Sequence, residues 1–305
     1  MKSIKIGLLG CLLLVLLAVP VRAEEKTPVA WGGVGSTFGP CGLGFPTGAL
    51  GVGGNVYFGK SNGVRESARR VNGNVKTTKL NEIFKLRYGI MDGLDVRTAT
   101  PIYNVHLDRQ GTANRDTYGV GDSTVLLHKT FLTQKSGDPF SLALDFGGIV
   151  PTGSVTEHSS DAAGNSAWGA VVGVGATYFL GANRFDSEVN YATFTEGARD
   201  YEHGDRVRWN LGYAYALSDR WDIGAESSWT MQEEARYKNE GMKDAYVEWY
   251  MGPKVSYKYT PWKLYAGLLA DAPVHRWYES NKAGSDDFRL QLKLIKVFNL
   301  NALFD

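Results

Sequence analysis

The chain has 305 residues, a formal net charge of +1 and only two cysteines. This length allows one large domain or two small ones, and the near-neutral charge argues against a nucleic-acid partner. Glycine and aromatic residues are abundant, with 37 Gly, 16 Tyr, 13 Phe and 8 Trp. Such a composition suits strands, tight turns and girdles of aromatic side chains.

The first 23 residues are predicted to be a signal peptide. Lys2 and Lys5 precede an apolar run over residues 7–19, and a small-residue cleavage pattern ends at Ala23. The mature chain would then begin at Glu24, with a formal charge of about −2 because three basic residues are lost. A single cysteine remains, which excludes an internal disulfide. No later apolar run reaches the roughly 18 residues of a membrane-spanning helix.

Residues 24–47 are rich in glycine and proline and show no periodicity. They are expected to form an irregular segment on the periplasmic side, before the first strand. A flexible tail is the favoured interpretation, because chain termini are usually loose unless tied down. A plug that enters the interior of a barrel is the alternative.

The rest of the chain alternates apolar and polar residues with a period of two, as strands do. In the segment 206–217, for example, Trp209, Leu211 and Tyr213 alternate with polar and small residues. The pattern predicts about twelve strands, which in chain order lie at 49–58, 80–90, 94–103, two within 119–153, 168–180, 184–191, 206–217, 221–229, 247–258, 262–272 and 288–294.

The connections between these segments alternate between short turns and long polar loops. Outer-membrane barrels are built in this way, with short turns in the periplasm and long loops outside the cell. Closure of the barrel also removes the open sheet edges that lipid would not tolerate. The sequence therefore predicts an all-β protein in which residues 48–305 form a transmembrane, antiparallel, up-and-down β-barrel.

A family resemblance is carried by the hairpin between Gly119 and Gly153. It reads GVGDSTVLLHKTFL and then PFSLALDFGGIVPTG, so a Gly-x-Gly-Asp strand is followed by a strand that ends in Pro-Thr-Gly. This hairpin resembles the outer-membrane family named after the meta-pathway of phenol degradation. The resemblance implies a barrel that passes small, often aromatic, compounds, with no catalytic residues to carry over. The chain departs from outer-membrane barrels at its end, where Asp305 follows the aromatic Phe304 that the barrel-assembly machinery would read.

Charged residues occupy many of the polar positions opposite the apolar face, and they are expected to line the lumen. A mixture of both signs would give a polar pathway that selects solutes, or a salt-bridged filling that leaves little open space. The predicted lumen-lining residues are Lys85, Arg87, Asp95, Arg97, Asp145, Glu188, Arg206, Arg208, Asp222, Glu226, Glu248, Lys254, Arg289 and Lys293.

Two weaker patterns suggest other chemistry. His158 and Ser160 share the His-x-Ser spacing of an outer-membrane phospholipase, although a Ser-rich surface loop explains them more simply. The histidines predicted in or beside extracellular loops could converge on a metal, but histidine is common in loops; they are His106, His158, His203 and His275.

The leading prediction is a passive channel in the outer membrane of a Gram-negative bacterium. It would pass small, hydrophobic or aromatic solutes, contact outer-membrane lipid, and need no cofactor, metal or catalysis. The alternatives are a lipid hydrolase that uses the His158 and Ser160 loop, and a closed structural or binding barrel. Pro101 and Pro253, within or near the ends of predicted strands, could also kink the wall and open a sideways exit, although a local bulge is the simpler interpretation.

Overall fold

The computed structural model describes residues 41–110, 114–154, 163–280, 282–283 and 285–300. The predicted signal peptide, most of the segment 24–47, and both His158 and Ser160 lie outside these residues. No helix in the described ranges is long and apolar enough to cross a bilayer.

The described chain is made almost entirely of strands, joined by turns and three short 3-10 helices at Gln134–Ser136, Ala198–Asp200 and Thr260–Trp262. The strands are β1 (Ala49–Glu66), β2 (Arg69–Met91), β3 (Leu94–Arg109), β4 (Arg115–Val120), β5 (Ser123–Leu132), β6 (Ser141–Val150), β7 (Gly169–Leu180), β8 (Asn183–Phe194), β9 (Tyr201–Glu202), β10 (Arg206–Ala216), β11 (Trp221–Gln232), β12 (Arg236–Tyr237), β13 (Glu240–Gly241), β14 (Tyr246–Tyr259), β15 (Leu264–Tyr278), β16 (Lys282–Ala283) and β17 (Phe288–Asn299).

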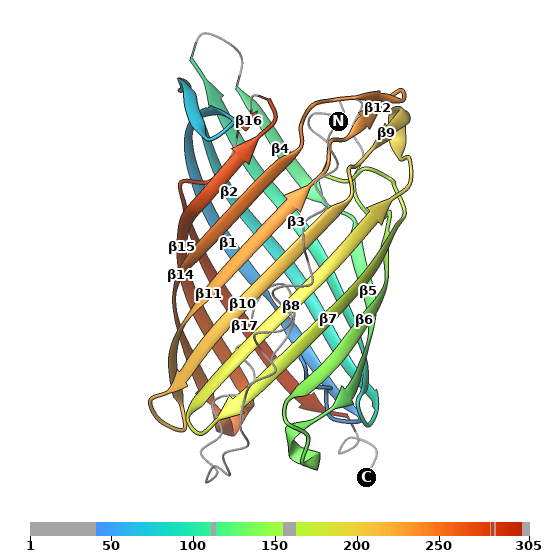
Figure 1. Ribbon diagram of the computed structural model, residues 1–305, viewed down its shortest axis with the longest axis vertical. Coiled ribbons are helices and arrows are strands. Elements are labelled where there is room, and N and C mark those ends of the chain that lie inside the picture. The colour runs from blue at the N-terminus through green and yellow to red at the C-terminus, as the bar shows by residue number, and fades with distance from the viewer. Residues whose placement is uncertain (1–40, 111–113, 155–162, 281, 284, 301–305) are drawn as a thin grey trace.

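Twelve of these strands form a closed antiparallel barrel, in the order β1, β2, β3, β5, β6, β7, β8, β10, β11, β14, β15 and β17 (Figure 1). The barrel closes because β1 pairs with β2 on one side and with β17 on the other, from Ala49↔Asn299 to Lys60↔Phe288. The predicted all-β barrel of about twelve strands is confirmed.

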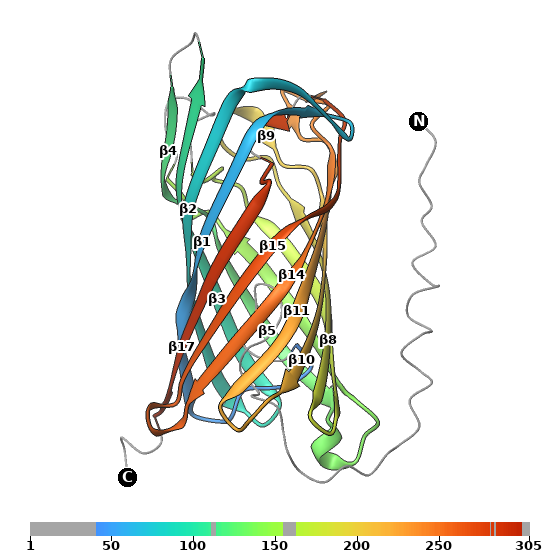
Figure 2. The same ribbon diagram turned by 90° about the vertical axis from the view of Figure 1, so that its left-hand side faces the viewer.

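The two ends of the barrel differ. One end carries short turns, such as that between β2 and β3, together with Ala49 at the start of β1 and Asn299 at the end of β17 (Figure 2). The other end carries the long connections, where β4 pairs with β3 above the barrel wall and β9, β12 and β13 form a separate small sheet. By the usual rule, the short-turn end faces the periplasm.

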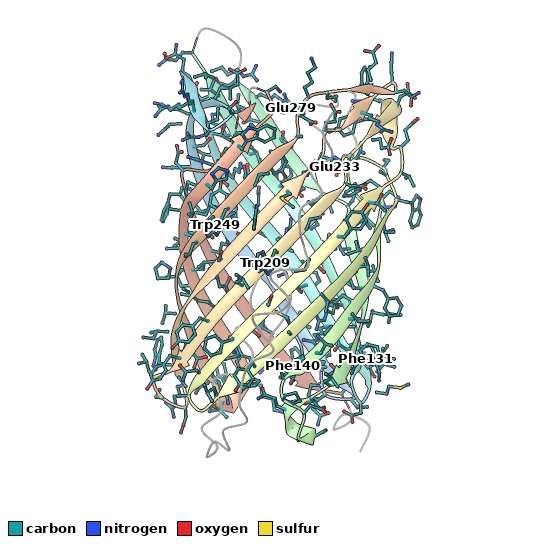
Figure 3. All side chains as sticks on the ribbon, in the orientation of Figure 1. Phe131, Phe140, Trp209, Glu233, Trp249 and Glu279 are labelled. Atoms are coloured by element: carbon teal, nitrogen blue, oxygen red, sulfur yellow. The ribbon has the colours of Figure 1, made fainter. Side chains whose placement is uncertain are left out.

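The outer wall is apolar and aromatic. Phe146 and Val172 leave about half of their surface exposed, at 50% and 54%, because their neighbours in the wall cover only their flanks. Trp209, Trp229 and Trp249 stack on adjacent strands, with ring centroids 5.9 and 6.4 Å apart, and Figure 3 labels two of them on this wall. Lipid is the environment that such a surface needs.

Several strands are longer than the sequence pattern predicts. Residues 59–79 were expected to be mostly polar loop, but β1 and β2 continue through them as a hairpin that turns beside Ser67. In the same way β15 continues to Tyr278 through part of a predicted loop. Beyond the lipid both faces of a hairpin meet water, so the backbone can stay paired while the period-two alternation of side chains is lost.

Both prolines coincide with interruptions of the backbone ladder. Pro101 falls between the part of β3 that pairs with β5 and the part that pairs with β4. Pro253 falls in a gap of the β14–β15 register, between Met251↔Ala272 and Lys254↔Leu269. A sideways exit at either place stays a prediction.

Adjacent valines on β7 test which face meets lipid. Val172 lies on the outer wall and Val171 faces the interior. We expect Val172→Arg to destabilise the folded protein in lipid vesicles by about 2 to 4 kcal/mol, because a charge near the middle of the bilayer is poorly solvated. Val171→Arg, the matched control, should cost much less. Equal losses in urea titrations of the two variants would mean that the assignment of faces on β7 is wrong.

Candidate functional site

An ion-pair cluster, here called the Asp95 network, fills the interior near the short-turn end. Arg87 donates to Asp95 through Nε and Nη2, at 2.7 and 2.6 Å. Arg97 donates from Nε to the same carboxylate at 3.1 Å and places Nη1 3.5 Å from Asp145 Oδ1. His128 Nδ1 lies 2.8 Å from Asp145 Oδ1. All five side chains are almost fully buried, so each charge depends on its neighbours rather than on water.

Residues 41–47, here called the inner segment, lie inside the barrel against this network. The backbone N–H of Phe45 donates to Asp95 Oδ2 at 2.9 Å, and Arg87 Nη2 donates to the carbonyl of Leu43 at 2.6 Å. On the far side the N–H of Gly42 donates to Thr177 Oγ1 at 3.0 Å. The inner segment therefore spans from β2 and β3 to β7, and its polar backbone groups are seated on the wall.

The inner segment lies so close to the barrel wall that a glycine is required on β7. A Cβ on Gly175 of β7 would lie 2.4 Å from the carbonyl oxygen of Cys41, well inside van der Waals contact. Cys41 itself and Phe45 are almost completely buried, at 0% and 2% exposure. The described part of the segment 24–47 is thus seated inside the barrel, and whether it acts as a plug stays a proposal.

Further ion pairs join strands higher in the wall. Glu226 accepts from Lys254 Nζ at 2.5 Å and from Lys293 Nζ at 3.0 Å, which links β11, β14 and β17. Arg289 donates to both oxygens of Asp271, at 2.6 and 2.5 Å. These buried pairs connect neighbouring strands and, through Lys293 and Glu226, also β17 with β11 across the interior.

The remaining predicted residues are also buried or half-buried. Lys85 and Asp222 are each 2% exposed. Glu188 accepts from Asn210 Nδ2 at 3.2 Å, and Glu248 accepts from the Tyr278 hydroxyl at 2.7 Å. Arg206, together with Arg208, borders a cavity instead of joining an ion pair of the described residues. Whether the whole predicted set lines a route for solute stays a proposal.

Sequence reasoning missed several members of these clusters. His128 completes the Asp95 network, Arg184 donates from Nε to Asp186 at 2.9 Å, and Asp271 is the partner of Arg289. The period-two alternation along each strand could have identified these residues as inward-facing, since each lies on the same face of its strand as other polar residues. Their ion-pair partners could not be predicted from the sequence, because pairing depends on the register between strands.

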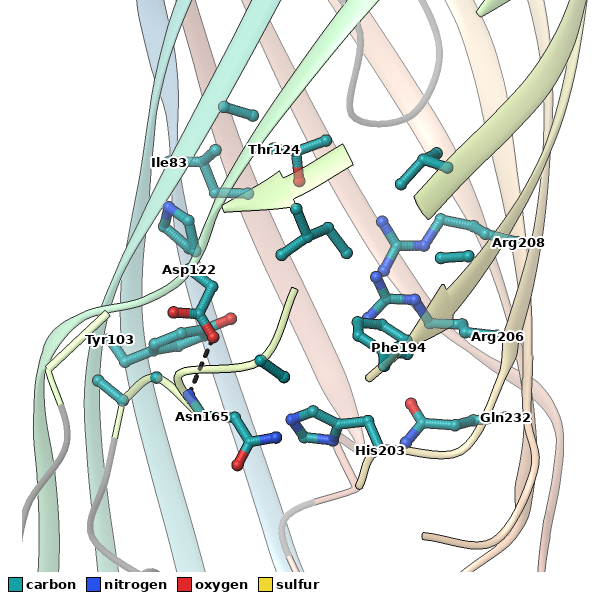
Figure 4. A pocket seen from close by; sticks show the side chains of 18 of the residues that line it. Ile83, Tyr103, Asp122, Thr124, Asn165, Phe194, His203, Arg206, Arg208 and Gln232 are labelled. Carbon is teal, nitrogen blue, oxygen red and sulfur yellow. Dashed lines mark hydrogen bonds between the residues drawn. The ribbon is translucent and has the colours of Figure 1, made fainter. Parts of the chain in front are cut away.

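A cavity of about 890 Å³ lies between the Asp95 network and the end of the barrel with the long connections. Its walls combine apolar side chains, including Tyr103 and Phe194, with the guanidinium groups of Arg206 and Arg208 (Figure 4). Arg97 and Glu188 also border it. The volume falls within the range of small-molecule sites, and so does the mixture of apolar walls with a few polar groups.

Asp122 shapes one side of this cavity. Its Oδ1 accepts from the N–H of Gly153 at 2.9 Å. Its Oδ2 accepts from the N–H of Asn165, also at 2.9 Å (Figure 4). The Gly-x-Gly-Asp and Pro-Thr-Gly parts of the hairpin thus meet, and Thr152 Oγ1 reinforces the join by accepting from the N–H of Ser123 at 3.0 Å. A Cβ on Gly153 would lie 2.5 Å from the Cα of Gly164, so the chain can cross here only with glycine.

The described histidines do not lie together in one cluster. His106 lies 2.5 Å from Asp116 on the exposed β3–β4 hairpin, and His203 packs between the rings of Phe194 and Tyr201 beside the cavity. His275 lies on β15, opposite Trp249. Within the described ranges no group of three or more His, Cys, Asp or Glu side chains could hold a metal.

These features define an outer-membrane β-barrel, the class of protein found in the outer membrane of Gram-negative bacteria. More narrowly, the chain belongs to the family described as "Putative MetA-pathway of phenol degradation", whose model matches residues 49–285. The resemblance drawn from the Gly119–Gly153 hairpin is therefore confirmed.

Several solved structures are similar to the chain at low sequence identity. An outer membrane channel from Pseudomonas putida F1 aligns with a TM-score of 0.72 and 16% identity, over 84% of this chain and 98% of that one. The translocator domain of the autotransporter NalP from Neisseria meningitidis gives a TM-score of 0.48 and 10% identity, over 83% and 89%. The CymD monoaromatic hydrocarbon channel gives 0.42 and 9%, over 84% and 90%. A search of curated proteins found no match.

Removal of the Asp122 carboxylate should loosen the hairpin without unfolding the barrel. Hydrogen bonds to a charged acceptor are each worth about 1.5 to 3 kcal/mol. In Asp122→Ala we therefore expect the amides of Gly153 and Asn165 to exchange with deuterium at least about tenfold faster. Asp138→Ala is the matched control, because Asp138 accepts from the N–H of Thr133 at 2.8 Å in a turn at the other end. Unchanged exchange at Gly153 and Asn165 would show that Asp122 does not hold this join.

Proposed function

We propose that the protein is a passive outer-membrane channel for small solutes with an apolar or aromatic body. The observation that carries the proposal is the cavity of about 890 Å³ inside a closed barrel, with apolar walls and arginine side chains together. A structural barrel needs only a filled interior, whereas this space is left open next to a densely paired region. The P. putida protein with the same fold is itself an outer membrane channel, which supports the proposal.

The route from the cavity would continue along the inward charges towards the periplasm. There it meets the Asp95 network and the inner segment, which crosses from β2 and β3 to β7. We propose that the inner segment acts as a plug that narrows the periplasmic exit. It is buried at Cys41 and Phe45 but lacks the continuous backbone ladder of the strands around it, so it can shift more readily than they can.

Solute flux into vesicles tests the channel. Purified protein in liposomes should let phenylalanine, a small aromatic solute that crosses lipid slowly, enter several times faster than liposomes without protein, because only the protein offers a polar path. Release of fatty acid from the same vesicles without flux would support the hydrolase with His158 and Ser160. Absence of both would leave the closed barrel as the better explanation and end the channel proposal.

The native cysteine distinguishes plug from tail. Cys41 is the only cysteine after the predicted signal peptide, and it is fully buried in the inner segment. We expect a water-soluble maleimide to label it at least about a hundredfold more slowly than a cysteine in an exposed turn, because the segment must first leave its seat. Asp219→Cys combined with Cys41→Ser provides that control, since Asp219 is exposed in the β10–β11 turn. Labelling of both at similar rates in the folded protein would identify a tail.

A further inference from the structure

Two neighbouring arginines in the cavity form no ion pair with any of the described residues. Arg206 and Arg208 are two residues apart on β10, so both project from the same face of the strand into the cavity. Figure 4 shows their guanidinium groups side by side, across the cavity from Tyr103. Neither forms a salt bridge with any carboxylate of the described residues, and Arg206 instead packs over the ring of Phe194 at 5.5 Å.

Other arginines that face the interior are paired with acidic side chains. Arg87, Arg97, Arg184 and Arg289 each form a salt bridge to an aspartate. An unpaired charge inside a protein costs free energy, and two like charges side by side cost more. Arg206 and Arg208, together with Arg199 on the same cavity, form no such bridge with a carboxylate of the described residues, so this cavity offers positive charge to something else.

Of the described residues, two carboxylates border the cavity, Asp122 and Glu188, and neither forms a salt bridge with Arg206 or Arg208. Asp122 accepts from the backbone N–H groups of Gly153 and Asn165. Glu188 accepts from Asn210 and borders the cavity together with Arg97. Both guanidinium groups therefore face the cavity without an ion-pair partner among the described residues, and an anion from outside can bind there.

We infer that the cavity binds a small carboxylate with an aromatic or short apolar body. The carboxylate would accept from Arg206 and Arg208, whose planar guanidinium groups suit two-oxygen acceptors. The apolar body would lie against Tyr103, Phe194 and Val171, which border the same space. This inference rests on the proposed channel function and narrows its solute class to organic anions.

Binding measured by calorimetry on the purified mature protein in detergent tests the inference. Benzoate and benzamide have nearly the same shape and differ in charge, so benzoate should bind at least about tenfold more tightly. In the double variant Arg206→Gln with Arg208→Gln this preference should fall to within about twofold. Arg206→Lys with Arg208→Lys keeps the charge and should retain part of the preference. Arg236→Gln, an exposed arginine of β12 that does not border the cavity, is the control for net charge.

Several outcomes would overturn the inference. Equal binding of benzoate and benzamide to the wild type would do so, even if the glutamine variant fails to fold. A preference that survives in a folded glutamine variant would place the anion elsewhere. Sulfate that displaces benzoate at equal concentration would show that the apolar walls contribute nothing. Phenylalanine flux into liposomes separates the two proposals, because flux without benzoate preference keeps the channel and removes the anion site.

Discussion

Backbone hydrogen bonding inside lipid is the constraint on which the rest of the structure depends. The core of a bilayer offers no water, so every N–H and C=O of a spanning segment must find a partner in the chain. β1 satisfies this by pairing with both β2 and β17, which leaves the barrel wall without an edge. Once the wall is closed, successive side chains must face lipid or interior in turn. The alternation of apolar and charged residues along the chain follows directly from that closure.

Closure in turn creates the problem of an interior full of charge. Removing a partner from a buried ion pair typically costs about 3 to 5 kcal/mol, because the remaining charge is left unpaired. In this barrel one acidic side chain can pair with two basic ones. Asp95 serves Arg87 and Arg97, while Glu226 serves Lys254 and Lys293. The region of buried ion pairs is consequently densely packed. The cavity lies beyond it, towards the end of the barrel with the long connections. The interior is thus divided into an ion-paired, packed part and a cavity.

The sequence predicted the architecture better than the site, for a physical reason. A period of two is a local property, so the faces of β10 or β7 can be assigned from a dozen residues. The extension of β1 to Glu66 was missed because the pattern fades where no lipid enforces it. The pairing of His128 with Asp145, and the meeting of Asp122 with Asn165, join segments that local periodicity cannot bring together. The position of Phe45 beside Asp95 could not be predicted either, since residues 24–47 show no periodicity.

The family signature itself proves to be structural. Gly121, Asp122 and Gly153 let two chain segments cross closely and hold them with a carboxylate, and this forms one side of the cavity whatever solute enters. Arg206, Arg208 and Phe194 lie on other strands and belong to no part of that signature. The hairpin therefore fixes one side of the cavity, whereas Arg206, Arg208 and Phe194, which we propose to contact the solute, lie outside it.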